Sequence, residues 1–412
     1  MRLPRYGLVI LLCLCGVQQS MASPIPGLAP QKDWDLNGYV KYMGSATYPD
    51  SQDNLLDHLL NQRVNFEYRI DKRLRFNLGM RNRLFYGDTS QFPAYGKLVG
   101  FDNGYFDLST NWLDSHGWVG NSQFDRAYLT FSTDEDWQFK LGRFRVNWAM
   151  SALWNPNDIF NAYSIYDFDY EERSGTDAIM VSRKLGFASS VELVFNANQD
   201  SDLNRYATRF LFNHDGWDMQ LIAGKAGTDR VFGAGFAGDI QGAGIRGEWS
   251  YFDPIYDNWP EREQVTNPLL STPSMLPELG FYSTHVATLE SDYSFASVRN
   301  WILRGSVLYI SSPMLADSAQ LYLNLPLSAR TLSFTQWTYY GEASFDWSAL
   351  SRVSLSASYY QDGSYFVGAS VSYSLANDWQ LQFIAQRFDG DIDSLFGQSA
   401  STLAFAQVKW SF

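Results

Sequence analysis

Six arginines between residues 61 and 86 all stand at odd-numbered positions, so they project from one side of an extended chain. A guanidinium group stays charged at physiological pH and binds carboxylates and phosphates through its fork of N–H donors. A row of such groups acts on passing ions through its electric field and needs no bond-making chemistry. With the basic residues that continue the pattern, the predicted row consists of Arg63, Arg69, Arg73, Arg75, Arg81, Arg83, Arg126, Arg143 and Arg145.

The residues between these arginines indicate the element that carries them. Val64, Phe66 and Tyr68 are apolar and alternate with the polar side, which is the period of a β-strand with one apolar face. Asp71-Lys72 fits a tight turn, after which the pattern restarts. Tilted strands of about 9–11 residues cross a bilayer, and apolar-out, polar-in alternation is typical of a transmembrane β-barrel. We therefore expect the arginines to line a lumen; a large soluble β-sandwich or β-helix is the alternative.

Composition agrees with a barrel and disfavours other classes. Aromatic residues make up 17% of the sequence, and 14 of them are Trp, as expected where rings gather at two membrane interfaces. The formal net charge of −13 disfavours nucleic acid as a partner.

The N-terminus has the pattern of a signal peptide. Arg2 and Arg5 precede an apolar segment, and Ser20-Met21-Ala22 offers small residues for cleavage after Ala22. The predicted organisation is a signal peptide (1–22), a periplasmic N-terminal lead (23–33) and a single transmembrane β-barrel domain (34–412). Both cysteines leave with the peptide, so disulfides and cysteine-ligated metals are not expected, and no cofactor is predicted. A lipoprotein anchor at Cys15 is the alternative, although the bulky Leu14 disfavours it.

The C-terminus carries a more specific pattern. Ala404, Ala406, Val408, Trp410 and Phe412 alternate up to a terminal aromatic residue. This resembles the last strand of Gram-negative outer-membrane β-barrels, where a terminal Phe forms part of the signal read by the barrel-assembly machinery. The resemblance implies export to the cell outer membrane, with that machinery, outer-membrane lipid and lipopolysaccharide as partners.

Short and long connections alternate along the chain, as they do between the periplasmic and external sides of such barrels. Short polar turns precede Trp137, Trp217, Trp301 and Trp379, which fits a tryptophan belt at the periplasmic interface. The pattern predicts an all-β antiparallel barrel of about eighteen strands, with sixteen as the fallback, and an open, water-filled lumen. The predicted long external loops are Gly44–Leu60, Gly87–Ser122, Trp148–Thr176, Asp253–Gly280, Ser311–Leu332 and Asp389–Ala400.

The external segment 148–176 resembles the loop that porins commonly fold into the lumen as a constriction. Its Asn-Pro-Asn-Asp run at 155–158 supplies turn chemistry, and its aromatic and acidic residues could face the arginine row. A surface loop that binds lipopolysaccharide through divalent cations is the alternative. The residues expected to form the constriction are Trp154, Asn155, Asp158, Tyr166, Asp167, Asp169, Glu171 and Glu172.

Enzymatic chemistry finds little support in the sequence. Of the four histidines, His285 has a serine nearby, Ser283, on the same strand face, which is the minimum for an esterase, but serine is common in these strands. The aspartates of the run 389–393 could bind calcium, although a solvated loop is the simpler interpretation. No enzyme activity and no metal site are predicted.

These observations predict an outer-membrane, porin-like channel for passive diffusion of small hydrophilic solutes, with a preference for anions. One alternative is a channel selective for an oligosaccharide or an exported polysaccharide, with the aromatic residues of 148–170 as a stacking track. Another is a non-conducting barrel that acts through its external loops.

Overall fold

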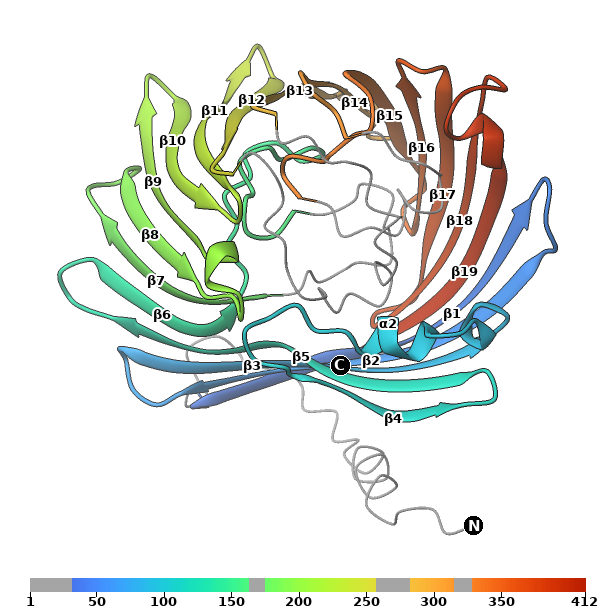
Figure 1. The fold of residues 1–412 in the computed structure, drawn as a ribbon, viewed down its shortest axis with the longest axis horizontal. Coiled ribbons are helices and arrows are strands. Elements are labelled where there is room, and N and C mark those ends of the chain that lie inside the picture. The colour runs from blue at the N-terminus through green and yellow to red at the C-terminus, as the bar shows by residue number, and fades with distance from the viewer. Residues whose placement is uncertain (1–31, 163–174, 257–281, 315–327) are drawn as a thin grey trace, which may run out of the picture.

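The computed structural model describes residues 32–162, 175–256, 282–314 and 328–412. Within them the strands form one antiparallel sheet that closes on itself (Figure 1). The strands are β1 (Trp34–Pro49), β2 (Leu55–Arg69), β3 (Leu74–Gly87), β4 (Ser109–Ser115), β5 (Trp118–Ser132), β6 (Trp137–Phe144), β7 (Thr176–Lys184), β8 (Ser190–Asn196), β9 (Arg205–His214), β10 (Trp217–Ala226), β11 (Asp229–Ile240), β12 (Ala243–Pro254), β13 (Thr284–Ser294), β14 (Ile302–Ile310), β15 (Trp337–Ser348), β16 (Ser351–Tyr360), β17 (Ser364–Ala376), β18 (Trp379–Gly390) and β19 (Ser401–Ser411). The helical turns are η1 (Thr89–Gln91), α2 (Tyr95–Gly100), η2 (Ser201–Leu203) and η4 (Gly397–Ser399). The predicted signal peptide and most of the N-terminal lead lie outside the described residues.

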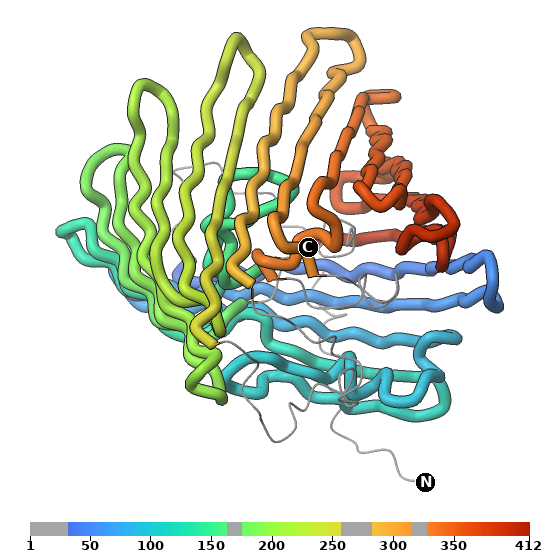
Figure 2. Tube along the Cα trace, turned by 45° about the horizontal axis from the view of Figure 1, so that its top comes forward, coloured from blue at the N-terminus to red at the C-terminus, as the bar shows by residue number. Residues whose placement is uncertain are grey.

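The first and last strands close the ring. β1 pairs with β2 on one side and with β19 on the other, from Tyr39 opposite Ser411 to Pro49 opposite Ser401. Figure 2 shows the blue strand β1 beside the red strand β19. β4 pairs only with β5, beyond the end of β6, so the ring itself has eighteen strands. The prediction of about eighteen strands is confirmed.

Alternation sorts the side chains as the sequence predicts. The outward positions are apolar and exposed, as at Leu221 (54% exposed), Leu289 (55%) and Leu355 (49%), whereas the neighbouring inward positions Gln220 and Glu290 are buried. An apolar exterior of this extent needs a bilayer around it. No helix within the described ranges is both long and apolar enough to cross a membrane.

Short turns gather at the end of the barrel that holds the chain termini. In the turn between β9 and β10, Asp215 and Gly216 have φ values of 51° and 84°, both positive as a type I′ hairpin requires. The tryptophans that begin β6, β10 and β18 stand at this same end. Long connections lie at the opposite end, so the predicted arrangement of periplasmic turns and external loops is confirmed.

Two of the external loops are shorter in the structure than the sequence predicts. The segment 44–60 is mostly strand, because β1 runs to Pro49 and β2 begins at Leu55. The segment 87–122 contains β4, the first residues of β5 and the helix α2. Small or polar residues such as Gly44, Ala46 and His58 occupy outward positions there, so the apolar alternation fades although the strand pairing continues.

A hydrophobic cluster lies inside the barrel, against the inner faces of β7 to β14. Its wall residues include Val194, Ile222, Val231 and Phe252, which stand at inward positions and are almost completely buried. A segment of the connection between β6 and β7 packs on them. Apolar inward residues therefore bind a loop along this side, and the expected open, water-filled lumen stays a prediction for the rest of the barrel. Alternation alone does not distinguish them from solvated residues.

Candidate functional site

The connection after β6 turns into the barrel, and Glu248 on β12 holds it there. The Glu248 carboxylate accepts hydrogen bonds from the backbone N–H groups of Met150 (2.5 Å), Ser151 (2.7 Å) and Asn157 (3.0 Å). Its side chain is only 3% exposed. Buried charges are stable in proteins when hydrogen bonds satisfy them, and these N–H groups do so here. Residues 145–162 thus form a loop on the inner wall, hereafter the inner loop.

Further wall residues bind the same loop. Glu290 on β13 accepts from the backbone N–H groups of Ala152 (3.1 Å) and Leu153 (3.0 Å). Gln220 on β10 donates to the carbonyl of Trp148 at 2.8 Å. The inner loop is therefore anchored through its backbone at three strands of the wall.

Glycines on β11 make room for this approach. Gly233 and Gly235 stand at inward positions beside the exposed, outward Phe232. A Cβ at Gly233 would lie 2.5 Å from Oδ1 of Asn157, and one at Gly235 would lie 2.9 Å from the sulfur of Met150. A larger residue at either position would have to displace the side chain of Asn157 or Met150.

Aromatic residues fill the space between the inner loop and the wall. Trp148 and Trp154 are 1% and 3% exposed, and Trp148 packs edge-on against Phe160 at 5.1 Å between ring centroids. The indole N–H of Trp148 donates to Glu192 on β8 at 2.7 Å, so its one polar group is satisfied. Both indole rings are covered, and neither offers a face on which a sugar could stack.

The predicted constriction residues fall into two groups. Trp154, Asn155 and Asp158 belong to the inner loop and are almost completely buried against the wall. The structure brings them together inside the barrel, while their part in narrowing the pore stays a prediction. The remaining predicted constriction residues lie outside the described residues: Tyr166, Asp167, Asp169, Glu171 and Glu172.

Carboxylates neutralise several of the predicted pore-lining arginines. Asp125 on β5 is 1% exposed and lies between two arginines: it forms an ion pair with Arg63 and another with Arg81, the latter at 2.8 Å. Arg63 is itself fully buried. A buried arginine beside a carboxylate exerts a weaker field on the lumen than an exposed one.

Arg143 is clamped in the same way at the external end of β6. It binds Asp177 on β7 (2.7 Å) and Asp102 (2.6 Å), and it also donates to the carbonyl of Phe106 (2.7 Å). Asp102 and Phe106 belong to the connection between α2 and β4. Arg143 therefore ties that connection to the wall, in addition to any role in the pore.

The other predicted arginines differ in their surroundings. Arg69 pairs with Asp35 and Glu67, and Arg73 pairs with Asp134 in the neighbouring turn. Arg83 and Arg145 also donate hydrogen bonds to neutral side chains, Arg83 to Asn121 at 2.8 Å and Arg145 to Asn147 at 3.3 Å.

Arg75 and Arg126 complete the row. Arg75 is exposed and forms no ion pair with a residue that the structure describes. Arg126 stands on β5 opposite Gly79 of β3, with its Cβ against that glycine. Whether any of the nine lines a conducting path stays a prediction.

Sequence reasoning missed the anchoring carboxylates. Neither Glu248 nor Glu290 is among the predicted site residues. One signal was present: Glu248 and Glu290 stand at inward positions of their strands, where a carboxylate that is removed from water needs partners. The glycines at 233 and 235 were a second signal, since they lie on one face of one strand.

The groups considered for catalysis do not assemble. Ser283 donates to Asp253 at 3.0 Å, whereas His285 packs on Tyr251 at 4.7 Å between ring centroids. Asp389 binds Arg387 at 2.6 Å. Among the described residues, no group of three or more histidines, cysteines or acidic residues is placed to hold a metal ion.

Comparison with solved structures identifies the architecture. OpdQ of Pseudomonas aeruginosa superposes with a TM-score of 0.56 at 8% identity, over 93% of this chain and 99% of that one. The outer membrane protein OprD of the same organism gives a TM-score of 0.55 at 8% identity, over 92% of this chain and 93% of that one. OccD3 (OpdP), also of this organism, gives a TM-score of 0.52 at 10% identity, over 92% of this chain and 91% of that one. The fold is that of a Gram-negative outer-membrane porin. No protein-family model matches the sequence of this porin-like barrel, and no curated protein matches it.

Proposed function

We propose that the chain is an outer-membrane channel for passive diffusion of small hydrophilic solutes. The observation that carries this proposal is the closed ring of eighteen strands with the inner loop bound to its inner wall by Glu248 and Glu290. A barrel this wide is not filled by its own side chains, so a loop held inside it sets the width of the path. The porin fold of similar structures supports the same function and gives no support for an enzyme.

A preference for anions forms the finer part of the proposal. Arg75 supports it, because this arginine is exposed and forms no ion pair with a described residue. The ion pairs of Arg63, Arg81 and Arg143 weaken it, since each guanidinium is partly neutralised by a nearby carboxylate. We therefore expect a modest preference.

Export and assembly follow from the same proposal. Residues 1–22 act as the signal peptide, residues 23–33 form the periplasmic lead, and the last strand ending at Phe412 is read by the barrel-assembly machinery. The backbone N–H of Phe412 donates to Gly38 at 2.9 Å, and its carbonyl accepts from Gly38 at 3.0 Å, so the terminal residue takes part in closing the ring. Lipid and lipopolysaccharide surround the exposed apolar exterior.

The test is single-channel recording of the refolded protein in a planar bilayer across a KCl gradient. Discrete conductance steps support a channel, and absence of conductance in correctly folded protein overturns it in favour of a barrel that acts through its external loops. The reversal potential tests the anion preference: Arg75→Ala should shift it toward cation selectivity. The matched control is Arg73→Ala, since Arg73 is paired with Asp134 in a turn at the barrel end.

A further inference from the structure

The inner wall changes its chemistry between β15 and β18. Inward positions on β16 and β17 carry serines, while the outward neighbours Leu355, Val371 and Tyr373 are large, apolar and exposed. Ionisable residues dominate the inner faces of β2 to β6, so the two sides of the barrel differ. We name the following residues the serine patch: Ser344, Ser354, Ser356, Ser370, Ser372 and Gln382.

Strand register arranges the serine patch as a grid. Ser354 stands opposite Ser344 on β15 and opposite Ser370 on β17. Ser372 stands opposite Gln382 on β18. Neighbouring strands lie about 4.7–4.9 Å apart, and inward residues on one strand repeat every second residue, at about 6.6 Å. Hydroxyl and amide groups are thus spaced a few ångströms apart in two directions.

Several of these groups are available to a solute. Ser344 accepts a hydrogen bond from Arg352 at 2.8 Å, and Gln382 accepts one from Gln407 at 2.5 Å, which leaves the amide N–H groups of Gln382 as donors. The hydroxyls of Ser354, Ser370 and Ser372 form no hydrogen bond with the part of the chain that the structure describes. All three serines are half-buried.

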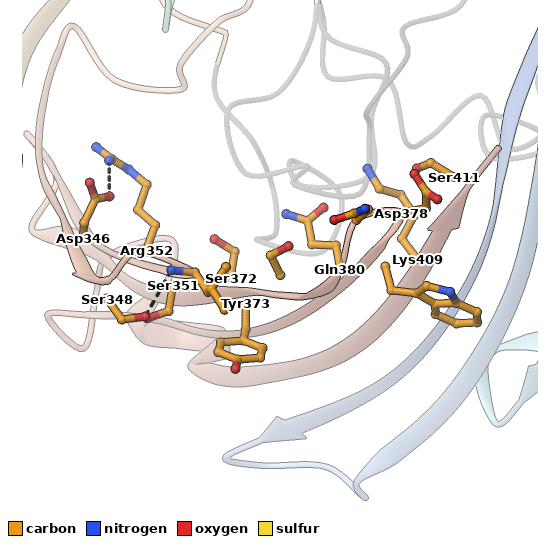
Figure 3. A pocket seen from close by; sticks show the side chains of 15 residues that line it. Asp346, Ser348, Ser351, Arg352, Ser372, Tyr373, Asp378, Gln380, Lys409 and Ser411 are labelled. Atoms are coloured by element: carbon orange, nitrogen blue, oxygen red, sulfur yellow. Dashed lines mark hydrogen bonds and ion pairs between the residues drawn. The ribbon is translucent and has the colours of Figure 1, made fainter. Parts of the chain in front are cut away.

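A groove of about 400 Å³ continues the serine patch toward the barrel end that holds the termini. It is lined by Ser372, Gln380, Lys409 and the ion pair of Arg352 with Asp346, whose atoms lie 2.8 Å apart. Figure 3 shows these side chains on one side of the sheet and Tyr373 on the other. Ligand sites for small molecules commonly enclose about 300–1,000 Å³. The groove therefore has room for a solute of monosaccharide or disaccharide size.

We propose that the serine patch and this groove form a binding track for uncharged polyhydroxylated solutes, such as neutral sugars and polyols. A hydroxyl both donates and accepts, so a serine grid matches a ring of solute hydroxyls, and the charged side chains Arg352 and Asp346 of the groove are paired with each other. The serine patch on β15 to β18 is separated from the arginine row on β2 to β6 by β19 and β1. This inference rests on the channel function proposed above and names one of its solute classes.

A serine can also be a small polar filler that only keeps the wall wet. In that case water would replace any one hydroxyl, and removing several would leave solute binding unchanged. A track predicts that the hydroxyls act together. Two readouts separate these cases: the ion conductance of the pore and its reduction by a neutral sugar.

The test uses the full mature protein in a planar bilayer, with maltose as the probe. We expect maltose to reduce the KCl current in a saturable way. In the variant Ser354→Ala/Ser370→Ala/Ser372→Ala the half-blocking concentration should rise by about tenfold or more, because up to three hydrogen bonds are lost. The KCl conductance itself should stay nearly unchanged, since no charge and little volume is removed. A short poly(ethylene glycol) controls for simple exclusion of ions by volume.

The matched control is Ser132→Ala/Ser182→Ala. Both serines stand at inward positions, on β5 and β7, outside the patch, and each faces Gln138 on β6. This variant should keep the maltose response of the unmodified protein. An unmodified pore that conducts but does not respond to maltose overturns the track and leaves the channel standing, as does an unchanged response in the triple variant. A folded protein without conductance overturns both proposals.

Discussion

Replacing Glu248 with Gln should loosen the inner loop. The carboxylate holds Met150 and Ser151 through one oxygen and Asn157 through the other, in a site that is 3% exposed. In the glutamine variant, the amide oxygen can still accept hydrogen bonds from Met150 and Ser151. The NH₂ group then faces the backbone N–H of Asn157, and two donors cannot form a hydrogen bond. Hydrogen bonds to a charged group contribute about 1.5–3 kcal/mol and neutral ones about 0.5–1.5, so the loss is about 3–5 kcal/mol.

This loss changes the ratio of attached to detached inner loop by roughly two to four powers of ten. Glu290 and the buried tryptophans still hold the loop, so we expect partial opening near residues 150–157. Single-channel conductance and current noise should both increase. A thiol at Ser151, which is 5% exposed, should react faster with a maleimide in the Glu248→Gln background. The predicted signal peptide contains both natural cysteines, so exported Ser151→Cys carries a single thiol.

Glu67→Gln is the matched control. Glu67 also faces the lumen, on β2, but it pairs with Arg69 and forms no hydrogen bond or ion pair with the described residues of the inner loop. It should change neither the conductance noise nor the reactivity of the Ser151 thiol. The reasoning is refuted if Glu248→Gln shows the conductance and thiol reactivity of the unmodified background.

Three further changes test other parts of the fold. Arg143→Met leaves the carboxylates of Asp177 and Asp102 buried without a countercharge. Removing one member of a buried ion pair costs about 3–5 kcal/mol of folding stability, so the folded band on semi-native gels should be lost at a lower temperature. In the external turn after β1, hydrogen bonds from Arg387 lower the pKa of the Asp50 carboxyl. This contact therefore contributes to folding stability at neutral pH, and the contribution is lost as the pH falls through the lowered pKa. Asp50→Asn should remove that part of the acid dependence of unfolding. Deletion of Phe412 should reduce the amount of barrel in the outer membrane of cells while in vitro refolding stays largely intact, and equal assembly in cells would contradict the predicted role of the C-terminal strand.

The sequence determined the class and the number of strands. Period-two alternation with apolar residues outward is a local property that survives in almost every strand, and turn residues such as Asp215 and Gly216 mark where each hairpin reverses. Bilayer thickness then limits how long each strand must be. These constraints act on neighbouring residues, so they can be seen without knowing which strands meet.

The strand ends were less predictable. β1 and β2 extend through Gly44 and His58, where the outward residues are small or polar. Above the apolar belt, the backbone N–H and C=O groups still pair, and outward rings such as those of Tyr42 and His58 stack across the hairpin. Alternation therefore underestimates strands that rise beyond the membrane.

Only the tertiary structure decided what the inward residues do. Arg63 and Arg81 are 62 and 44 residues from Asp125 in the chain, and Glu248 is 98 residues from Met150. Pairing of β2, β3 and β5 brings the first three residues together, and packing of the inner loop against β12 brings Met150 to Glu248. A charged residue on an inward face satisfies the same alternation whether it is solvated, paired with a distant charge or bound to a loop. The sequence therefore shows that a side chain faces the lumen, and the fold decides whether that side chain meets a solute or another part of the chain.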